Sequence, residues 1–287
     1  MRAGVLTDIH VSLDPERSAS WHNEYDFAGL GGRLRGAAEL FAAEGAELVL
    51  ALGDLAHDGD ALSLEAALSP LASGPPLHVV GGNHDGPRPT AALAALELDG
   101  VRLPGWRALR TMDAVRTAAV RVERRAARRW AAARPPAMAT WGDEAVLLAS
   151  HFPVLSRAAE VHARGLPYAG DLLDRPALAA RLLARPAPTI VVCGHLHVRE
   201  SVASGALLQI ACGALIEPPF EATILDLEAA GGDTLRVTRS AHELGAAPER
   251  RDPRLSPTEE SWTFSPRGGW RRSQPGSRGR RAPLPAP

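Results

Sequence analysis

The sequence contains no lysine, so all 32 of its basic residues are arginine, and 33 acidic residues leave a formal net charge of −1. The overall basic charge typical of nucleic-acid-binding proteins is therefore missing, and we expect no nucleic-acid partner. Cysteine is nearly absent. Cys193 and Cys212 both lie in apolar runs, which argues against a disulfide framework and indicates buried thiols.

Long hydrophobic runs are missing as well. No apolar stretch approaches the roughly 18 residues of a membrane-spanning helix, so we expect no membrane partner. Residues 1–8 have the pattern of a buried strand rather than of a signal peptide, and we expect a cytoplasmic protein. At 287 residues, 45% of them hydrophobic, the chain can bury a full core. Nothing in the composition indicates an oligomeric state.

Short runs rich in Val, Leu and Ile alternate with segments of helical periodicity. Strands are expected within residues 2–10, 46–54, 75–85, 144–153, 188–197, 206–215, 221–229 and 233–244, and helices within 27–47, 60–68 and 174–188. This alternation predicts an α/β protein whose sheets are covered by helices. The last strands follow one another without helices, which suggests a second, partly antiparallel sheet.

Two further segments complete the predicted domain organisation. Residues 1–246 are expected to form one domain, with 86–140 as a helical insert or lid. The clearest helix in that insert is expected at 112–134, where an apolar stripe runs beside several arginines. Residues 247–287 are rich in Pro, Arg, Gly and Ser without an apolar period, so we expect a disordered tail.

Polar residues gather where five of the predicted strands end. The groups are Asp8-x-His10, Gly53-Asp54, Asn83-His84-Asp85, His151 and His195-x-His197. The carboxyl ends of strands in an open α/β sheet are where ligands bind. A single group of this kind is more often a turn, but five in order, each after an apolar run, predict one shared site.

The residue types at these strand ends indicate metal binding. The candidate ligands are Asp8, His10, Asp54, Asn83, His151, His195 and His197. Oxygen and imidazole ligands without thiolates suit Mn²⁺, Fe²⁺ or Fe³⁺, or Zn²⁺. Seven ligands exceed what one tetrahedral ion takes, so two ions roughly 3.5–4 Å apart are expected. Asp54 is the natural bridging ligand, because it lies between the other motifs.

The order Asp-x-His, Gly-Asp, Gly-Asn-His-Asp, His, Gly-His-x-His resembles that of the calcineurin-like metallophosphoesterase superfamily, over about residues 1–240. The resemblance implies a four-layer α/β/β/α sandwich around two mixed sheets. It also implies one metal held by Asp8, His10, Asp54 and His197, and a second held by Asp54, Asn83, His151 and His195. It assigns to His84 the contact with the substrate phosphate and the protonation of the leaving oxygen.

The activity implied is hydrolysis of a small phosphodiester or phosphomonoester, such as a cyclic nucleotide or a nucleotide-like ester. A hydroxide bridging the two ions would attack phosphorus in line. We further expect Asp85 to orient His84, as a carboxylate often orients a histidine. His22 and Asn23, in the loop after the first motif, are candidate substrate-binding residues, and His57 is a weaker one.

A different class of function also has to be considered. The fold could be retained as a non-catalytic scaffold or interaction protein. Degenerate motifs would indicate such a role, above all the loss of Asp54 or His84, and both residues are present. The sequence therefore favours the enzyme.

Overall fold

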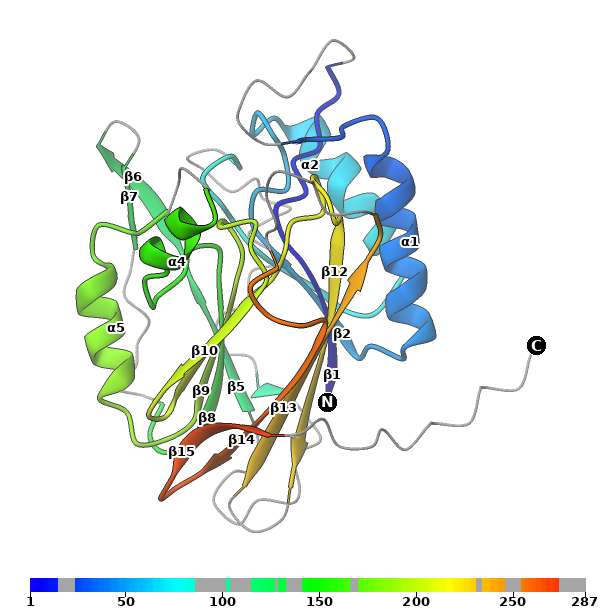
Figure 1. The fold of residues 1–287 in the computed structure, drawn as a ribbon. Coiled ribbons are helices and arrows are strands. Elements are labelled where there is room, and N and C mark those ends of the chain that lie inside the picture. Colours follow the sequence, from blue (N-terminus) through cyan, green and yellow to red (C-terminus); the bar gives the residue numbers. More distant parts are fainter. Residues whose placement is uncertain are drawn as a thin grey trace.

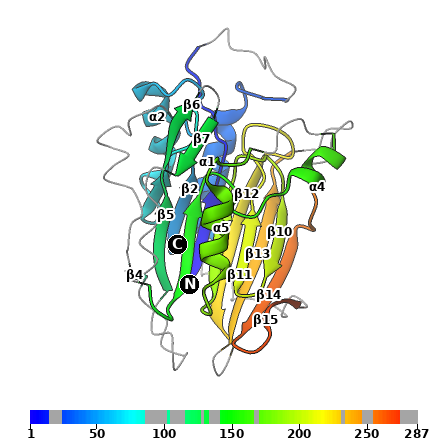
Figure 2. The same cartoon turned by 90° about the vertical axis from the view of Figure 1, so that its left-hand side faces the viewer.

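The computed structural model describes residues 1–14, 24–85, 102–103, 115–126, 129–132, 141–165, 170–230, 234–245 and 254–273. Two large sheets pack face to face, and helices cover their outer faces (Figure 1, Figure 2). The predicted four-layer α/β/β/α sandwich of two mixed sheets is thus confirmed. Within the described ranges, no helix combines the length and the apolar character needed to cross a membrane.

The first sheet has seven strands in the order β15-β14-β13-β12-β1-β2-β3. They are β1 (Arg2–Leu6), β2 (Leu48–Leu52), β3 (Leu77–Val80), β12 (Glu221–Ala229), β13 (Leu235–Glu243), β14 (Glu259–Ser265) and β15 (Gly269–Ser273). β1, β2 and β3 run parallel to one another, and β12 to β15 continue the sheet in antiparallel pairs. The sequence had suggested that the last strands form a second sheet. That prediction is wrong, because β12 to β15 extend the first sheet.

The second sheet has six strands in the order β10-β11-β9-β8-β5-β4. They are β4 (Arg102–Leu103), β5 (Val115–Val120), β8 (Ala145–Ser150), β9 (Thr189–Cys193), β10 (Glu200–Ser204) and β11 (Leu207–Ala211). The four inner strands are parallel, and each edge strand pairs antiparallel with its neighbour. A separate hairpin joins β6 (Val122–Ala126) to β7 (Arg129–Ala132).

Alternate side chains of the strands point to opposite faces of each sheet, so the core has three layers. Leu50 of β2 and Leu147 of β8 meet in the core between the sheets, whereas Val49 faces the helices outside. Among the described residues, the helices are α1 (Leu30–Ala43), α2 (Ala61–Leu68) with the short 3-10 turn η1 (Ser69–Leu71), α4 (Ala158–Ala163) and α5 (Arg175–Leu183). Both faces of the inner strands are buried, which explains their continuous apolar runs. Gly45, with φ of 67°, follows the last residues of α1 as predicted.

The expected helix at 112–134 is wrong. Residues 115–120 form β5, and the β6–β7 hairpin follows directly. β5 pairs in parallel with β8, and Ala118 and Val120 are buried in the core of the second sheet. Alanine and arginine are among the strongest helix formers, but intrinsic helix propensity is a weak preference, and this long-range pairing overrides it. Residues 86–101, 104–114, 127–128 and 133–140 lie outside the described ranges, so a lid there stays a prediction.

The expected disorder of 247–287 is also wrong for the part that the structure describes. Residues 254–273 contain β14 and β15, and Phe264 and Trp270 belong to the core between the sheets. The indole Nε1 of Trp270 donates a hydrogen bond to the carbonyl oxygen of Ala206, in the second sheet's β10–β11 turn. Composition concealed this hairpin because only a few of its residues are apolar. Residues 246–253 and 274–287 lie outside the described ranges.

Candidate metal centre

The five polar motifs meet at one place, because β1, β2, β3, β8 and β9 all end there. Six of the predicted ligands form two triads whose donor atoms lie within 4.8 Å of one another. One triad is Asp8, His10 and His197, and the other is Asp54, His151 and His195. Each triad is part of one of the two four-ligand sets that the resemblance implied, and the binding of ions by these sets stays a prediction. Residues as far apart in the chain as 8 and 197 thus become neighbours.

Asp54 lies between the two triads. Its Oδ2 is 3.3 Å from Nε2 of His151, in its own triad, and 3.6 Å from Nε2 of His10, in the other. The amide oxygen of Asn83 lies 3.1 Å from the same nitrogen of His151, which places the seventh predicted ligand beside the second triad. A carboxylate in this position is suited to bridging two cations, as the sequence predicted for Asp54.

The backbone at this centre adopts conformations that residues with side chains usually avoid. Five of the predicted ligands have φ between 51° and 65°, in the left-handed region: Asp8, His10, Asp54, His195 and His197. Each costs of order 1–3 kcal/mol and persists only where the surrounding structure imposes it. Such strain clusters at functional sites, and here it turns successive side chains toward one point.

Two glycines allow other segments to approach the carboxylates. A Cβ on Gly82 would overlap Oδ1 of Asp54, and one on Gly194 would overlap the hydroxyl of Thr7 and Oδ2 of Asp8. With Gly194 in place, the backbone N–H of His195 donates to Oδ2 of Asp8 at 2.9 Å. Gly194 is therefore needed for close packing, and it lacks the positive φ that would have required glycine for the turn itself.

Other groups hold the histidines in place from behind. Nδ1 of His197 is 2.8 Å from Oε1 of Glu217, and Nδ1 of His151 is 2.8 Å from the carbonyl oxygen of Leu52. Nδ1 of His10 lies 3.4 Å from Nδ1 of His57. Such partners fix the ring so that its other nitrogen faces the place where an ion would be held. Sequence reasoning missed Glu217 altogether, although an acidic residue inside the apolar run 214–220 was a usable signal.

Burial and charge act in opposite directions on the ionisable side chains. Burial lowers the pKa of His151, but the carboxylates of Asp54 and Asp8 outweigh it and raise this pKa to about 9. Burial, together with the neighbouring His151, lowers the pKa of His195 to about 3. Burial raises the pKa of Asp54, yet the adjacent histidines hold it well below its usual range. The neighbouring carboxylates therefore favour a proton on His151, which a bound cation would have to displace.

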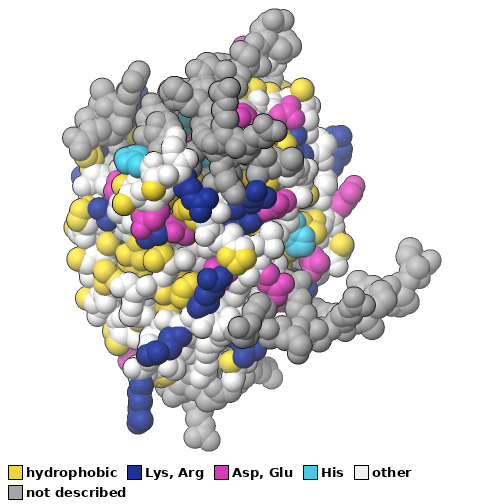
Figure 3. Space-filling view, in the orientation of Figure 1, with side chains coloured by type: hydrophobic (Ala, Val, Ile, Leu, Met, Phe, Trp, Pro, Cys, Tyr) yellow, Lys and Arg dark blue, Asp and Glu magenta, His cyan; other side chains and the backbone are white. Residues whose placement is uncertain are grey.

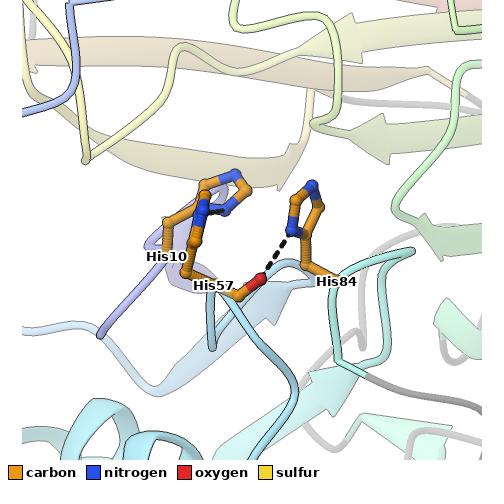
Figure 4. Close-up of side chains that lie close together, drawn as sticks. All are labelled: His10, His57 and His84. Atoms are coloured by element: carbon orange, nitrogen blue, oxygen red, sulfur yellow. Dashed lines mark hydrogen bonds between the residues drawn. The ribbon is translucent and has the colours of Figure 1, made fainter. Parts of the chain in front are cut away.

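His84 is held by contacts other than the one predicted. Its Nδ1 lies 2.7 Å from the carbonyl oxygen of His57 (Figure 4). Its backbone N–H donates to Oδ1 of Asp54 at 2.8 Å. Figure 4 shows the rings of His10, His57 and His84 gathered from three different loops. His84 is partly exposed, and because its Nδ1 is bonded to His57, the ring's Nε2 is the nitrogen that can contact a bound molecule.

The expected orientation of His84 by Asp85 is wrong. Asp85 is buried, and its Oδ1 accepts hydrogen bonds from the backbone N–H groups of Leu55 and Ala56 at 2.7 and 3.0 Å. Its Oδ2 accepts one from the N–H of Gly82 at 2.7 Å. Asp85 thus ties the loop after β3 to the loop that carries Asp54. The carboxylate satisfies backbone donors, which a sequence pattern does not reveal.

The predicted substrate-binding residues His22 and Asn23 lie outside the described residues, and their role stays a prediction. The described part of the same loop brings Tyr25 to the centre. Its ring stacks on that of His197, with ring centres 5.8 Å apart and an angle of 21° between the planes.

The donor set fits two metal ions. Nε2 of His10 is buried without a hydrogen-bond partner among the described residues, although buried polar atoms are nearly always paired. This nitrogen faces Oδ2 of Asp54, within the group of carboxylates and imidazoles. An ion at this point would satisfy it. The set holds oxygen and nitrogen donors only, which suits Mn²⁺, iron or Zn²⁺ and does not select among them.

Comparisons with known proteins agree with this geometry. The sequence model of the calcineurin-like phosphoesterase family matches residues 1–199. The chain is similar in structure to a dimetal phosphatase from Danio rerio, with 16% identity and a TM-score of 0.60 over 85% of this chain and 96% of that one. At this identity the likeness shows the fold alone.

Two further solved structures are similar at lower scores. Purple acid phosphatase PPD1 from yellow lupin is 12% identical, with a TM-score of 0.49 over 92% of this chain and 53% of that one. Zinc-bound Vps29 from Entamoeba histolytica is 16% identical, with a TM-score of 0.37 over 84% and 92%. Among curated protein sequences, no significant match was found. The match over residues 1–199, which includes all five motifs, shows that the chain belongs to the calcineurin-like phosphoesterase family.

Proposed function

We propose that this chain is a metal-dependent phosphoesterase that hydrolyses a small phosphomonoester or phosphodiester. The observation that carries the proposal is the pair of donor triads with Asp54 between them. Asp8, His10, Asp54 and His197 would hold one ion, and Asp54, Asn83, His151 and His195 the other. When bound, two divalent ions neutralise phosphate charge and lower the pKa of a water molecule toward neutrality.

The protein's own contribution to the reaction comes chiefly from His84. Because Nδ1 of His84 donates to the carbonyl oxygen of His57, a second proton on this ring resides on Nε2, the nitrogen free to face a substrate. That nitrogen can hydrogen-bond a phosphate oxygen and give its proton to the departing alkoxide. General acid catalysis of this kind contributes about 10²–10⁴-fold to the rate.

A small substrate is supported by the distribution of charge. The chain has a net charge of −1. On the face drawn in Figure 3, arginines are scattered among acidic and apolar side chains over the described surface. Nucleic acids are usually bound by a continuous basic surface. A cyclic nucleotide or nucleotide-like ester requires only the metal centre and a few neighbouring side chains, such as Tyr25, whose ring could stack on a base.

The proposal is tested by activity and metal content measured together. The purified protein, loaded with Mn²⁺, Fe²⁺ or Zn²⁺, is assayed on bis-p-nitrophenyl phosphate, p-nitrophenyl phosphate, 2′,3′- and 3′,5′-cyclic nucleotides and nucleoside monophosphates. We expect hydrolysis of at least one class, lost in Asp54→Ala together with bound metal. Two bound ions without turnover of any of these esters would contradict the enzyme and favour the non-catalytic scaffold.

A further inference from the structure

The loop that carries His195 and His197 is supported by a segment beyond the family match. His195 and His197 each belong to one of the two triads, whereas the alternate residues Leu196 and Val198 are buried in a separate cluster. That cluster also contains Val161 of α4, and Leu255 packs against it. Leu255 lies 58 positions after His197 in the sequence, outside the matched residues 1–199.

The backbone of the same segment is bonded to the end of the loop. The carbonyl oxygen of Arg199 accepts hydrogen bonds from the N–H groups of Leu255 at 2.9 Å and Ser256 at 3.1 Å. The hydroxyl of Ser256 in turn accepts one from the N–H of Ser201 at 3.2 Å. A single parallel bridge between Arg199 and Arg254 therefore joins this segment to the residue where the loop ends and β10 begins.

The side chain of Arg199 fastens this contact to the rest of the sheet. It is 3% exposed, and its Nε donates to the carbonyl oxygen of Ser256 at 2.9 Å. Its Nη1 lies 2.8 Å from a carboxylate oxygen of Glu221 and 2.8 Å from one of Glu243. Glu221 also accepts a hydrogen bond from the N–H of Gly213, at the start of the loop that carries Glu217. One guanidinium thus joins three segments around the histidine loop.

We propose that Arg199 and residues 254–256 position His195 and His197 for metal binding, so that the C-terminal segment is part of the metal centre's support. Both histidines have φ above 50°, a conformation that lasts only while the surroundings enforce it. Together with Val161, Leu255 packs against the apolar residues of this loop, and Arg199 bonds the end of the loop to residues 254–256. His195 and His197 belong to different triads, so loosening the loop weakens both metal sites.

The inference rests on the proposed metal centre, and its test measures metal binding instead of turnover. Leu255→Ala removes the contact beneath Leu196 and Val198. Arg199→Lys keeps a positive charge beside the two glutamates but cannot also hold the Ser256 carbonyl. Leu77→Ala is the matched control, since Leu77 is likewise partly buried but packs against the core under α1 and α2. Titration calorimetry with Mn²⁺ and Zn²⁺ gives the affinity, and thermal unfolding of the metal-free proteins gives their stability.

We expect Leu255→Ala and Arg199→Lys to bind both ions about tenfold or more weakly, the effect usual for groups that orient ligands. Leu77→Ala should lower the melting temperature while leaving the affinities unchanged. Wild-type affinities in folded Leu255→Ala and Arg199→Lys would overturn the inference, as would an equal loss of affinity in Leu77→Ala. Tight binding of two ions by a wild-type protein that hydrolyses no ester would refute the proposed catalysis and leave this inference standing.

Discussion

Nδ1 of His197 lies 2.8 Å from Oε1 of Glu217, and both side chains are buried. The carboxylate fixes the ring so that Nε2 points toward Asp8, 3.3 Å from its Oδ1. We expect Glu217→Ala to weaken metal binding about 10–100-fold, because the ring loses its orientation and its basicity. Titration calorimetry with Zn²⁺ measures the change, and Glu228→Ala, an exposed carboxylate, is the control. Equal affinities for the wild type and Glu217→Ala would show that the contact is not needed.

His84 is expected to act on the leaving group and not on the metals. His84→Ala should keep both ions, as elemental analysis would show, and lower kcat by about 10²–10⁴-fold for esters with poor leaving groups. Nitrophenolate needs little protonation, so p-nitrophenyl esters should be less affected. A uniform loss across good and poor leaving groups would contradict the general-acid role and indicate binding of the phosphate instead.

Metal binding should release protons. Burial lowers the pKa of His151, but the nearby carboxylates of Asp54 and Asp8 raise it to about 9. The pKa of His197 is also raised: burial lowers it, but Tyr25, Asp8 and Glu217 outweigh this. A cation displaces these protons, so affinity should fall by up to about tenfold per pH unit for each proton displaced as the pH drops from 8 to 6. Calorimetry in buffers of different ionisation enthalpy counts the protons, and heats independent of buffer would refute the displacement.

The same shift predicts how the metal-free protein responds to pH. A histidine whose pKa is higher when folded than when unfolded stabilises the fold fully below its unfolded value, about 6.5. For His151 that contribution is lost as the pH rises through about 9. Metal-free protein should therefore melt at a lower temperature at pH 9.5 than at pH 6.5, and His151→Gln should reduce the difference. If the difference between the melting temperatures at pH 6.5 and pH 9.5 were the same in His151→Gln, groups other than His151 would be responsible for it.

The hairpin of β14 and β15 should be essential for stability. Trp270 is 6% exposed in the core between the sheets, so Trp270→Ala should lower the free energy of unfolding by about 3–5 kcal/mol. Urea denaturation measures the change. A chain that stops after residue 253 should not fold cooperatively, whereas one that stops after Ser273 loses no described residue and should match the full chain. A stable, cooperative fold without residues 254–273 would show that the hairpin is dispensable.

Many of the strands and of the candidate site residues could be predicted from local sequence patterns. Apolar runs such as LVLAL at 48–52 identify strands buried on both faces, and the polar residues directly after them mark the site. Seven candidate ligands could therefore be named before any fold was known, and the structure places all of them at one centre. Asp-x-His and Gly-His-x-His indicate metal ligands without knowledge of the fold, because a metal needs particular donor atoms at short spacing.

Other features depended on contacts between distant residues. Val115–Val120 forms a strand because β8 offers it a partner, and Trp270 is buried because the edges of both sheets meet beside it. Asp85 binds backbone N–H groups 29 and 30 positions away, which no local pattern announces. The sequence by itself determined which atoms can bind metal, since that depends on residue type. Only the tertiary structure decided what holds those atoms in place, because hydrogen bonds and packing act between segments that meet only in the folded chain.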